Sequence, residues 1–152
     1  MRNKTSKNIR ESSLGWMLKS LSACMDKKVQ HDLSKHNLTQ AQFGIMMTLL
    51  EEDGISQSEI GSRITMPGYA TTRNLDSLED MKLLERRQDP TSRRSYCIYL
   101  TDKGRAVAPE LYKIVKGVNK ELVMPFSKTE VEQFTVLLKK LLASWNENDS
   151  QY

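Results

Sequence analysis

The chain has 152 residues, of which 38% are hydrophobic and 28% charged, and it carries a formal net charge of +4 at pH 7. This length suits one domain, with or without oligomerisation arms. The longest apolar runs are far shorter than the ~18–20 residues of a membrane span, and the first residues lack the apolar core of a secretory signal. Two cysteines and two histidines leave little for a disulfide framework or a metal site, and no phosphate-binding glycine loop or hydrolase motif is present. We therefore expect a soluble, cytoplasmic protein without cofactor or metal that is not an enzyme.

The excess of basic residues is unevenly distributed. Residues 1–37 contain eight basic and three acidic side chains, a net charge of +5, whereas residues 38–55 carry −3. Residues 56–101 and 102–152 each carry +1. A basic chain is compatible with nucleic-acid binding. An excess of this size is weak evidence by itself, so the positions of the basic residues have to decide.

The first predicted element is a long helix over residues 9–35. Cys24 lies on or beside its apolar stripe, and we expect a small buried side chain there rather than a redox switch. Trp16 and Met17 favour a core position over a ligand site, and His31 and His36 are expected at the surface. The stripe itself follows helical spacing and consists of Leu14, Leu18, Leu21, Met25, Val29 and Leu33.

Three capping boxes predict helices that begin near residues 40, 57 and 128. In each box a Ser or Thr stands three residues before a Gln or Glu, and apolar residues flank the cap as a hydrophobic staple. The helix from residue 40 is followed by Gly54, which suits a left-handed C′ position. The three boxes are Thr39 with Gln42, Ser56 with Glu59, and Ser127 with Glu130.

Residues 57–82 have the pattern of a helix-turn-helix. A short helix over 57–64 is followed by Met66-Pro67-Gly68, and Pro67 suits the first turn of a second helix that reaches about Lys82. The residues expected on one side of this second helix are Thr72, Leu75, Leu78 and Met81.

Residues 83–100 change to the alternating pattern of β-strands. The segment Asp89-Pro90-Thr91-Ser92-Arg93-Arg94 indicates a polar turn, so a β-hairpin is predicted. Tyr96, Ile98 and Leu100 are expected on one face of its second strand. Helices are predicted after it over 102–124, with Pro109 as a candidate bend, and over 128–147. The predicted fold class is mainly α with a small β-hairpin wing (α+β).

The order helix-turn-helix and hairpin is typical of nucleic-acid-binding proteins. In such units the N-terminal part of the second helix enters the major groove, and here that part, residues 68–74, contains no acid. Arg73 suits reading of guanine and Tyr69 suits a sugar or a thymine methyl, while a solvated polar face and an ordinary polar turn are the plain alternatives. The candidate DNA-binding residues are Ser56, Gln57, Gly68, Tyr69, Ala70, Thr71, Thr72, Arg73, Asn74, Arg93 and Arg94.

Residues 38–104 resemble the MarR family of bacterial winged helix-turn-helix transcription regulators, and the flanking helices match in place and length. The resemblance rests on an ordered set of motifs, none decisive alone. They are Leu38-Thr39-x-x-Gln42-Phe43, Asp53-Gly54-Ile55-Ser56-Gln57-Ser58-Glu59-Ile60, Thr72-Arg73-x-Leu75-Asp76-x-Leu78-Glu79, Leu83-Leu84-x-Arg86, Asp89-Pro90-x-x-Arg93-Arg94 and Leu100-Thr101-Asp102-Lys103-Gly104.

The resemblance implies a homodimer that binds double-stranded DNA. Residues 1–37 and 102–152 would form a helical dimerisation region, and residues 38–101 a winged helix-turn-helix DNA-binding lobe. Two-fold symmetry then predicts a pseudo-palindromic operator with half-sites ~34 Å apart. The family also implies a small aromatic or anionic effector; the plausible lining residues are Trp16, Phe43, Met47 and Arg86, although packing is the simpler role for each.

The sequence departs from the family pattern in two places. The family's wing has an acid that steadies its arginine, and here Ser92 stands in that place before Arg93-Arg94, so Arg94 is the expected wing contact without that support. The peroxide-sensing branch has a reactive cysteine near the start of the first helix, and Cys24 lies over two turns later.

The leading hypothesis is a dimeric, sequence-specific transcription regulator of the repressor type. The alternatives are a winged-helix protein–protein adaptor, or a regulator that lacks a small-molecule effector. A small-molecule enzyme has almost no support, because no paired acids, nucleophile–base set or metal ligands emerge.

Overall fold

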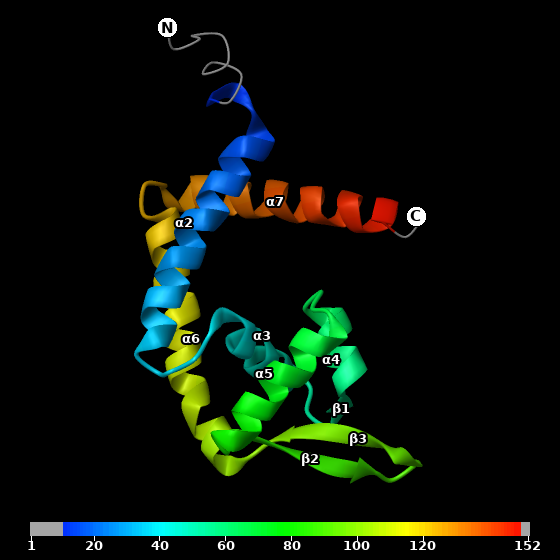
Figure 1. The fold of residues 1–152 in the computed structure, drawn as a ribbon. Helices are drawn as coiled ribbons and strands as arrows, with labels where there is room; N and C mark the ends of the chain where they lie inside the picture. The colour runs from blue at the N-terminus through cyan, green and yellow to red at the C-terminus, as the bar shows by residue number, and fades with distance from the viewer. Residues whose placement is uncertain (1–10, 150–152) are drawn as a thin grey trace, which may run out of the picture. The chain divides into compact units, whose positions relative to one another are not determined.

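A computed structural model of the chain describes residues 11–149. The fold is mainly helical with one small three-stranded antiparallel sheet, which confirms the predicted class (Figure 1). The chain divides into two compact units, Met1–Val118 and Asn119–Tyr152. The first unit contains all three strands and every helix up to most of α6, so the candidate site belongs to it alone.

Helix α2, Leu14–Ser34, is shorter than the predicted helix over residues 9–35. Ser13 interrupts the helical backbone and caps α2, because its hydroxyl oxygen accepts a hydrogen bond from the Trp16 N–H at 3.3 Å; residues 9 and 10 lie outside the described residues. Only the C-terminal part of the apolar stripe packs inward: Leu33 is buried, whereas Leu14, Leu18 and Leu21 are exposed.

Helices α3 (Gln40–Glu51), α4 (Gln57–Arg63) and α5 (Gly68–Asp80) begin where the sequence predicts. Both hydrogen bonds of the capping box are formed at Thr39 and at Ser127. At Ser56 one of the two hydrogen bonds is formed: the Ser56 hydroxyl oxygen accepts from the Glu59 N–H. The Glu59 carboxylate pairs with Arg63 instead of accepting from the Ser56 N–H. Pro67 is the N-cap of α5 rather than a residue of its first turn.

The sheet has the strand order β1-β3-β2, with β1 at Ile55–Ser56, β2 at Leu84–Asp89 and β3 at Ser92–Leu100. Sequence analysis predicted the β2–β3 hairpin and missed β1, because a two-residue strand is too short for any periodic pattern. Gly54 has the expected positive φ, +77°. It lies in the turn to β1 and not at C′ of α3, because α3 ends at Glu51; an added Cβ would be 2.8 Å from the Tyr99 ring.

One hydrophobic core joins α2, α3, α5, the sheet and the first half of α6. Helix α6, Asp102–Val123, contributes Leu111 and Ile114 to it. Gly104 lets the first turn of α6 approach the backbone just before strand β2, since an added Cβ would overlap the Leu83 carbonyl oxygen. Leu38 and Leu33 close the core at the α2–α3 junction.

The second unit contains the end of α6 and helix α7, Lys128–Asp149. The rings of Phe126 and Phe134 pack with centroids 5.7 Å apart. Most of the apolar face of α7 is exposed in the single chain, including Val136, Leu137, Leu141, Leu142 and Trp145. Across residues 11–149, none of the helices is both long and apolar enough to cross a membrane.

The contact at Gly104 gives the first testable prediction. We expect Gly104→Ala to lower the free energy of unfolding by about 1–3 kcal/mol, because backbone rather than a flexible side chain blocks the new methyl group. Gly117→Ala is the matched control in the same helix, since no atom lies within 4 Å of its added Cβ. Urea unfolding at one protein concentration measures both, and equal midpoints for the two variants would contradict the assignment.

Candidate nucleic-acid interface

Helices α4 and α5 form a tight helix-turn-helix. Gly61 lies where they approach most closely: a Cβ there would be 2.9 Å from the Thr71 hydroxyl oxygen and 3.0 Å from the Met66 carbonyl oxygen. The turn between them includes Thr65 in the left-handed region, at φ +52°. Such close packing fixes the direction in which α5 leaves the turn.

The outer face of α5 presents two large exposed side chains. Tyr69 is 81% exposed, and Arg73 lies one turn later on the same face. Among the residues that the structure describes, Arg73 has no hydrogen-bond or ion-pair partner. Gly68 and Thr72 are also exposed, while Ala70 and Asn74 are half-buried. These residues therefore form a continuous surface that a macromolecule can contact.

Thr71 does not belong to this surface, and its prediction as a DNA-contacting residue is wrong. Its side chain is completely buried, and its hydroxyl donates to the Pro67 and Met66 carbonyl oxygens at 3.1 and 3.4 Å. The buried stripe of α5 is Thr71, Leu75 and Leu78. The predicted stripe contained Thr72 in place of Thr71, since spacings of three and four residues both fit a helix of 3.6 residues per turn.

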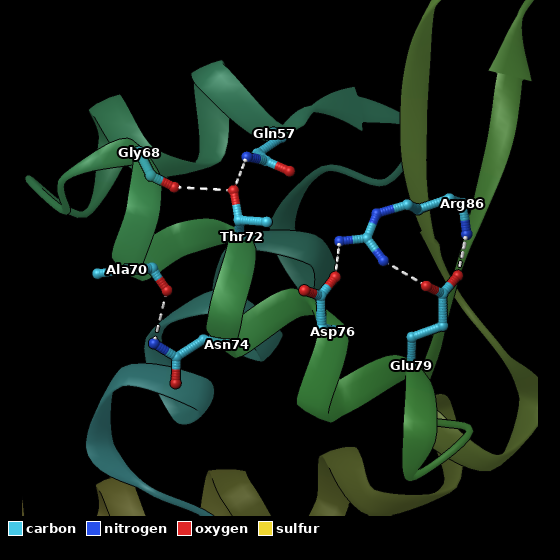
Figure 2. A network of polar contacts seen from close by, with 8 residues as sticks. All are labelled: Gln57, Gly68, Ala70, Thr72, Asn74, Asp76, Glu79 and Arg86. Carbon is cyan, nitrogen blue, oxygen red and sulfur yellow. Dashed lines mark hydrogen bonds and ion pairs between the residues drawn. The ribbon is translucent and has the colours of Figure 1, made fainter.

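Thr72 and Gln57 connect the two helices at the protein surface (Figure 2). The Gln57 side-chain amide donates to the Thr72 hydroxyl oxygen at 2.5 Å, and that hydroxyl donates to the Gly68 carbonyl oxygen at 3.0 Å. Asn74 donates to the Ala70 carbonyl oxygen at 2.8 Å. The sequence did not suggest these contacts, which hold part of the polar surface in one conformation before any ligand binds.

The wing differs from its prediction at the tip. The turn is confined to Pro90 and Thr91, while Ser92, Arg93 and Arg94 already belong to β3. The hydroxyl oxygens of Ser92 and Ser95 lie 2.9 Å apart, so the residue that replaces the family's acid has a local partner. Asp89 accepts from the Thr91 hydroxyl and N–H, each at 2.7 Å, and these hydrogen bonds lower the pKa of its carboxyl group.

Arg86 is bound to α5, and its suggested role in lining a ligand site stays a prediction. Its guanidinium pairs with Glu79 and lies 2.6 Å from Asp76, and its backbone N–H donates to Glu79 at 3.0 Å (Figure 2). Sequence reasoning missed this network. A signal was present, because Arg86 lies two residues after buried Leu84 and therefore shares its inner face of β2, where an arginine requires an acidic partner.

Of the other three suggested ligand-lining residues, two pack against the core and one is exposed. Phe43 and Met47 are partly buried and pack against the hydrophobic core, as their simpler interpretation predicted. Trp16 is 48% exposed on α2, so its expected core position is wrong for the single chain, as is that of Met17. Cys24 is also exposed and not buried, because the N-terminal part of α2 extends beyond the core.

The buried and exposed threonines of α5 can be tested against each other. We expect Thr71→Val to lower the free energy of unfolding by about 1 kcal/mol, because the isosteric change removes a buried hydroxyl that satisfies two carbonyl oxygens. Thr72→Val should change it little, since the groups it releases can bind water. Thermal unfolding of both variants at one concentration measures the difference; greater destabilisation by Thr72→Val would contradict the burial pattern.

Comparisons with known proteins place this architecture in a family. The model of the MarR family matches residues 36–95. The chain is 39% identical over 75 residues to the HTH-type transcriptional regulator TtmR of Methylorubrum extorquens, an alignment that covers 49% of this chain and 38% of that regulator. It is 31% identical over 109 residues to the uncharacterized HTH-type transcriptional regulator YkoM of Bacillus subtilis, which covers 72% of this chain and 71% of YkoM.

A solved structure agrees in fold over most of the chain. A mutant MarR from E. coli, complexed with operator DNA, superposes with a TM-score of 0.75 at 27% identity and covers 85% of this chain and 93% of that one. The match to YkoM extends over most of both proteins, and the segment matched by the MarR model contains the helix-turn-helix and most of the hairpin. The chain therefore belongs to the MarR family of winged helix-turn-helix transcription regulators.

Proposed function

We propose that this protein is a dimeric, sequence-specific DNA-binding transcription regulator that recognises a pseudo-palindromic operator. The observation that carries the proposal is the outer face of α5, where exposed Tyr69 and unpaired Arg73 lie on a helix whose opposite face is buried in the core. The related MarR of E. coli has been solved in complex with operator DNA. A helix of this kind enters the major groove with its N-terminal residues against base edges.

The distribution of charge along α5 supports this orientation. Its first seven residues contain no acid, and its acids begin at Asp76. Asp76 and Glu79 are both paired with Arg86. The only charged side chain at the N-terminal end of α5, which would enter the groove, is therefore that of Arg73. A bidentate contact between an arginine and a guanine contributes about 1–3 kcal/mol of discrimination against the wrong base.

The wing supplies the second contact in this proposal. Arg93 and Arg94 are the second and third residues of β3, next to the tip turn, and hairpin tips that carry arginine can enter a minor groove. Ser56 and Gln57 at the start of α4 would contact the phosphate backbone. Gln57 keeps its carbonyl oxygen and a second amide hydrogen free of the Thr72 contact.

Exposed apolar residues outside the lobe support a homodimer. Residues 1–37 and 102–152 would form the dimerisation region and residues 38–101 the DNA-binding lobe. Leu14, Leu18 and Leu21 on α2 are 40–76% exposed, and Trp145 on α7 is 71% exposed. Exposed apolar residues repeated along one helix are unusual on a monomer and mark an interface. A dimer would cover it and would place two α5 helices on half-sites ~34 Å apart.

Repression, control by an effector and a cytoplasmic location complete the proposal. A small aromatic or anionic ligand near Trp16, Phe43 and Met47 would release DNA only if it preferred a lobe spacing that does not fit both half-sites. An anion that approached Arg86 would compete with two carboxylates that already bind it, so an effector-free regulator is a coherent form of the same proposal. No catalytic role is proposed.

Selection of bound sequences from random duplex DNA tests the proposal directly. The purified protein should enrich an inverted repeat, and its affinity for that repeat should fall steeply with salt. Binding that is indifferent to sequence would favour a winged-helix protein–protein adaptor instead. A monomeric protein that enriches no duplex would refute the proposal.

Arg73→Ala should relax the base preference within each half-site. We expect discrimination at one base pair to fall by about 1–3 kcal/mol, because the exposed guanidinium is the group that would read guanine. Arg63→Ala on α4 is the control, since it removes an arginine that is engaged by Glu52 and Glu59. Competition titrations with single-base operator variants measure the preference, and an unchanged ranking in Arg73→Ala would show that Arg73 does not read a base.

Arg94→Ala should weaken binding to all duplexes alike. The salt slope of the association constant should fall by about one unit if one phosphate contact is lost. Lys116→Ala, an equal charge change at an exposed position of α6, is the control and should leave the slope unchanged. If Arg94→Ala and Lys116→Ala have the same slope, the wing does not contact DNA.

A further inference from the structure

Strand β2 and the recognition helix α5 are joined by a three-residue polar bracket. The Arg86 guanidinium lies between the carboxylates of Asp76 and Glu79, which are three residues apart on α5 (Figure 2). Glu79 additionally accepts the Arg86 backbone N–H at 3.0 Å, so it binds both the strand and its side chain. Arg86 is therefore attached to α5 through both its backbone and its side chain.

The arginine at the centre of the bracket is largely shielded from solvent. The Arg86 side chain is 21% exposed, against 39% for Glu79 and 58% for Asp76. Planar guanidinium groups bind carboxylates in fixed directions. The bracket therefore restricts the angle between α5 and β2, whereas the pair of Arg87 with Glu85 lies within β2 alone and joins it to no helix.

The position of the bracket along β2 determines which part of the hairpin it can hold. Arg86 pairs with Ile98 on β3, and the buried packing of the hairpin ends at these residues, because Tyr96, next outward on the same face, is 52% exposed. The hairpin continues to Asp89, three residues beyond Arg86, about 10 Å of strand. On α5, Asp76 lies three residues after Arg73. Among the polar contacts of the side chains that the structure describes, the bracket is thus the outermost link between α5 and the hairpin.

We propose that Arg86 is a positioning residue for DNA binding, which sets the wing at a fixed angle to α5 so that both reach one DNA duplex together. This inference rests on the proposed function, since it assigns a role within the same DNA-binding lobe. Arg86 contacts protein and not DNA in this role. Without the bracket, the wing pays an entropic cost each time it is ordered on DNA, and the contribution of its arginines falls.

A purely electrostatic role makes the opposite prediction for one variant. If Arg86 served only to neutralise two acids close to DNA, then Asp76→Asn with Glu79→Gln would remove that repulsion and tighten binding. If Arg86 positions the wing, the same double change breaks the bracket and weakens binding although two negative charges have gone. The sign of the change separates the two roles.

The experiment compares Arg86→Gln with Arg87→Gln in the full chain. Both remove one positive charge from adjacent residues of β2, but Arg87 faces the other side, where it lies 4.5 Å over the Tyr99 ring. We expect Arg86→Gln to lower affinity for the selected operator about tenfold more than Arg87→Gln does. Arg94→Ala should then cost little in the Arg86→Gln background, because an unpositioned wing has little binding to lose.

Hydrogen exchange without DNA gives an independent measurement. We expect the β2–β3 amides beyond Arg86 to exchange faster in Arg86→Gln and in the Asp76→Asn, Glu79→Gln double variant, and to be unchanged in Arg87→Gln. If Arg86→Gln does not fold, operator affinity and hydrogen exchange are both measured on the double variant. Unchanged exchange in a folded variant, tighter binding by the double variant, or equal affinities of Arg86→Gln and Arg87→Gln would each overturn the inference. Faster exchange together with a wild-type protein that selects no duplex would support the bracket and refute only the proposed function.

Discussion

The fold of the lobe depends on the burial of one face of α5. Thr71, Leu75 and Leu78 are completely inaccessible, and this stripe fixes the rotation of the helix about its own axis. Rotation by one residue would bury Arg73 or Thr72 and expose a leucine, at a cost of about 1.5–3 kcal/mol for the leucine alone. Because that rotation is fixed, Tyr69 and Arg73 have to point away from the protein. The candidate interface is thus a consequence of the core.

Polar contacts then fix what the core leaves undetermined. Buried Gln42 closes the cap of α3 with its carbonyl oxygen and donates to Ser77 of α5 at 2.9 Å. At the base of the sheet, Asp53 accepts the Leu100 N–H at 2.9 Å and pairs with Arg105 of α6. These side chains connect elements that are distant in sequence. Together with Arg86 they make the helix-turn-helix and the wing one structural unit.

Much of the fold could be predicted because its signals are local. A capping box needs only residues within one turn, so the starts of α3, α4 and α7 were placed correctly. The hairpin could be predicted equally well, because apolar residues alternate along a strand with a period of two. Strand β1 was missed because two residues carry no period, and the exposure of Cys24 and Trp16 was missed because an apolar stripe does not show what it packs against.

The sequence by itself determined the order and type of the elements other than β1, the basic character of the wing and the acid-free start of α5, since each depends on neighbours along the chain. Only the tertiary structure decided which threonine of α5 is buried and which carboxylates Arg86 binds. The rotation of a helix is set by the elements packed against it, and an ion pair between a strand and a helix seven or ten residues away depends on how the chain turns between them.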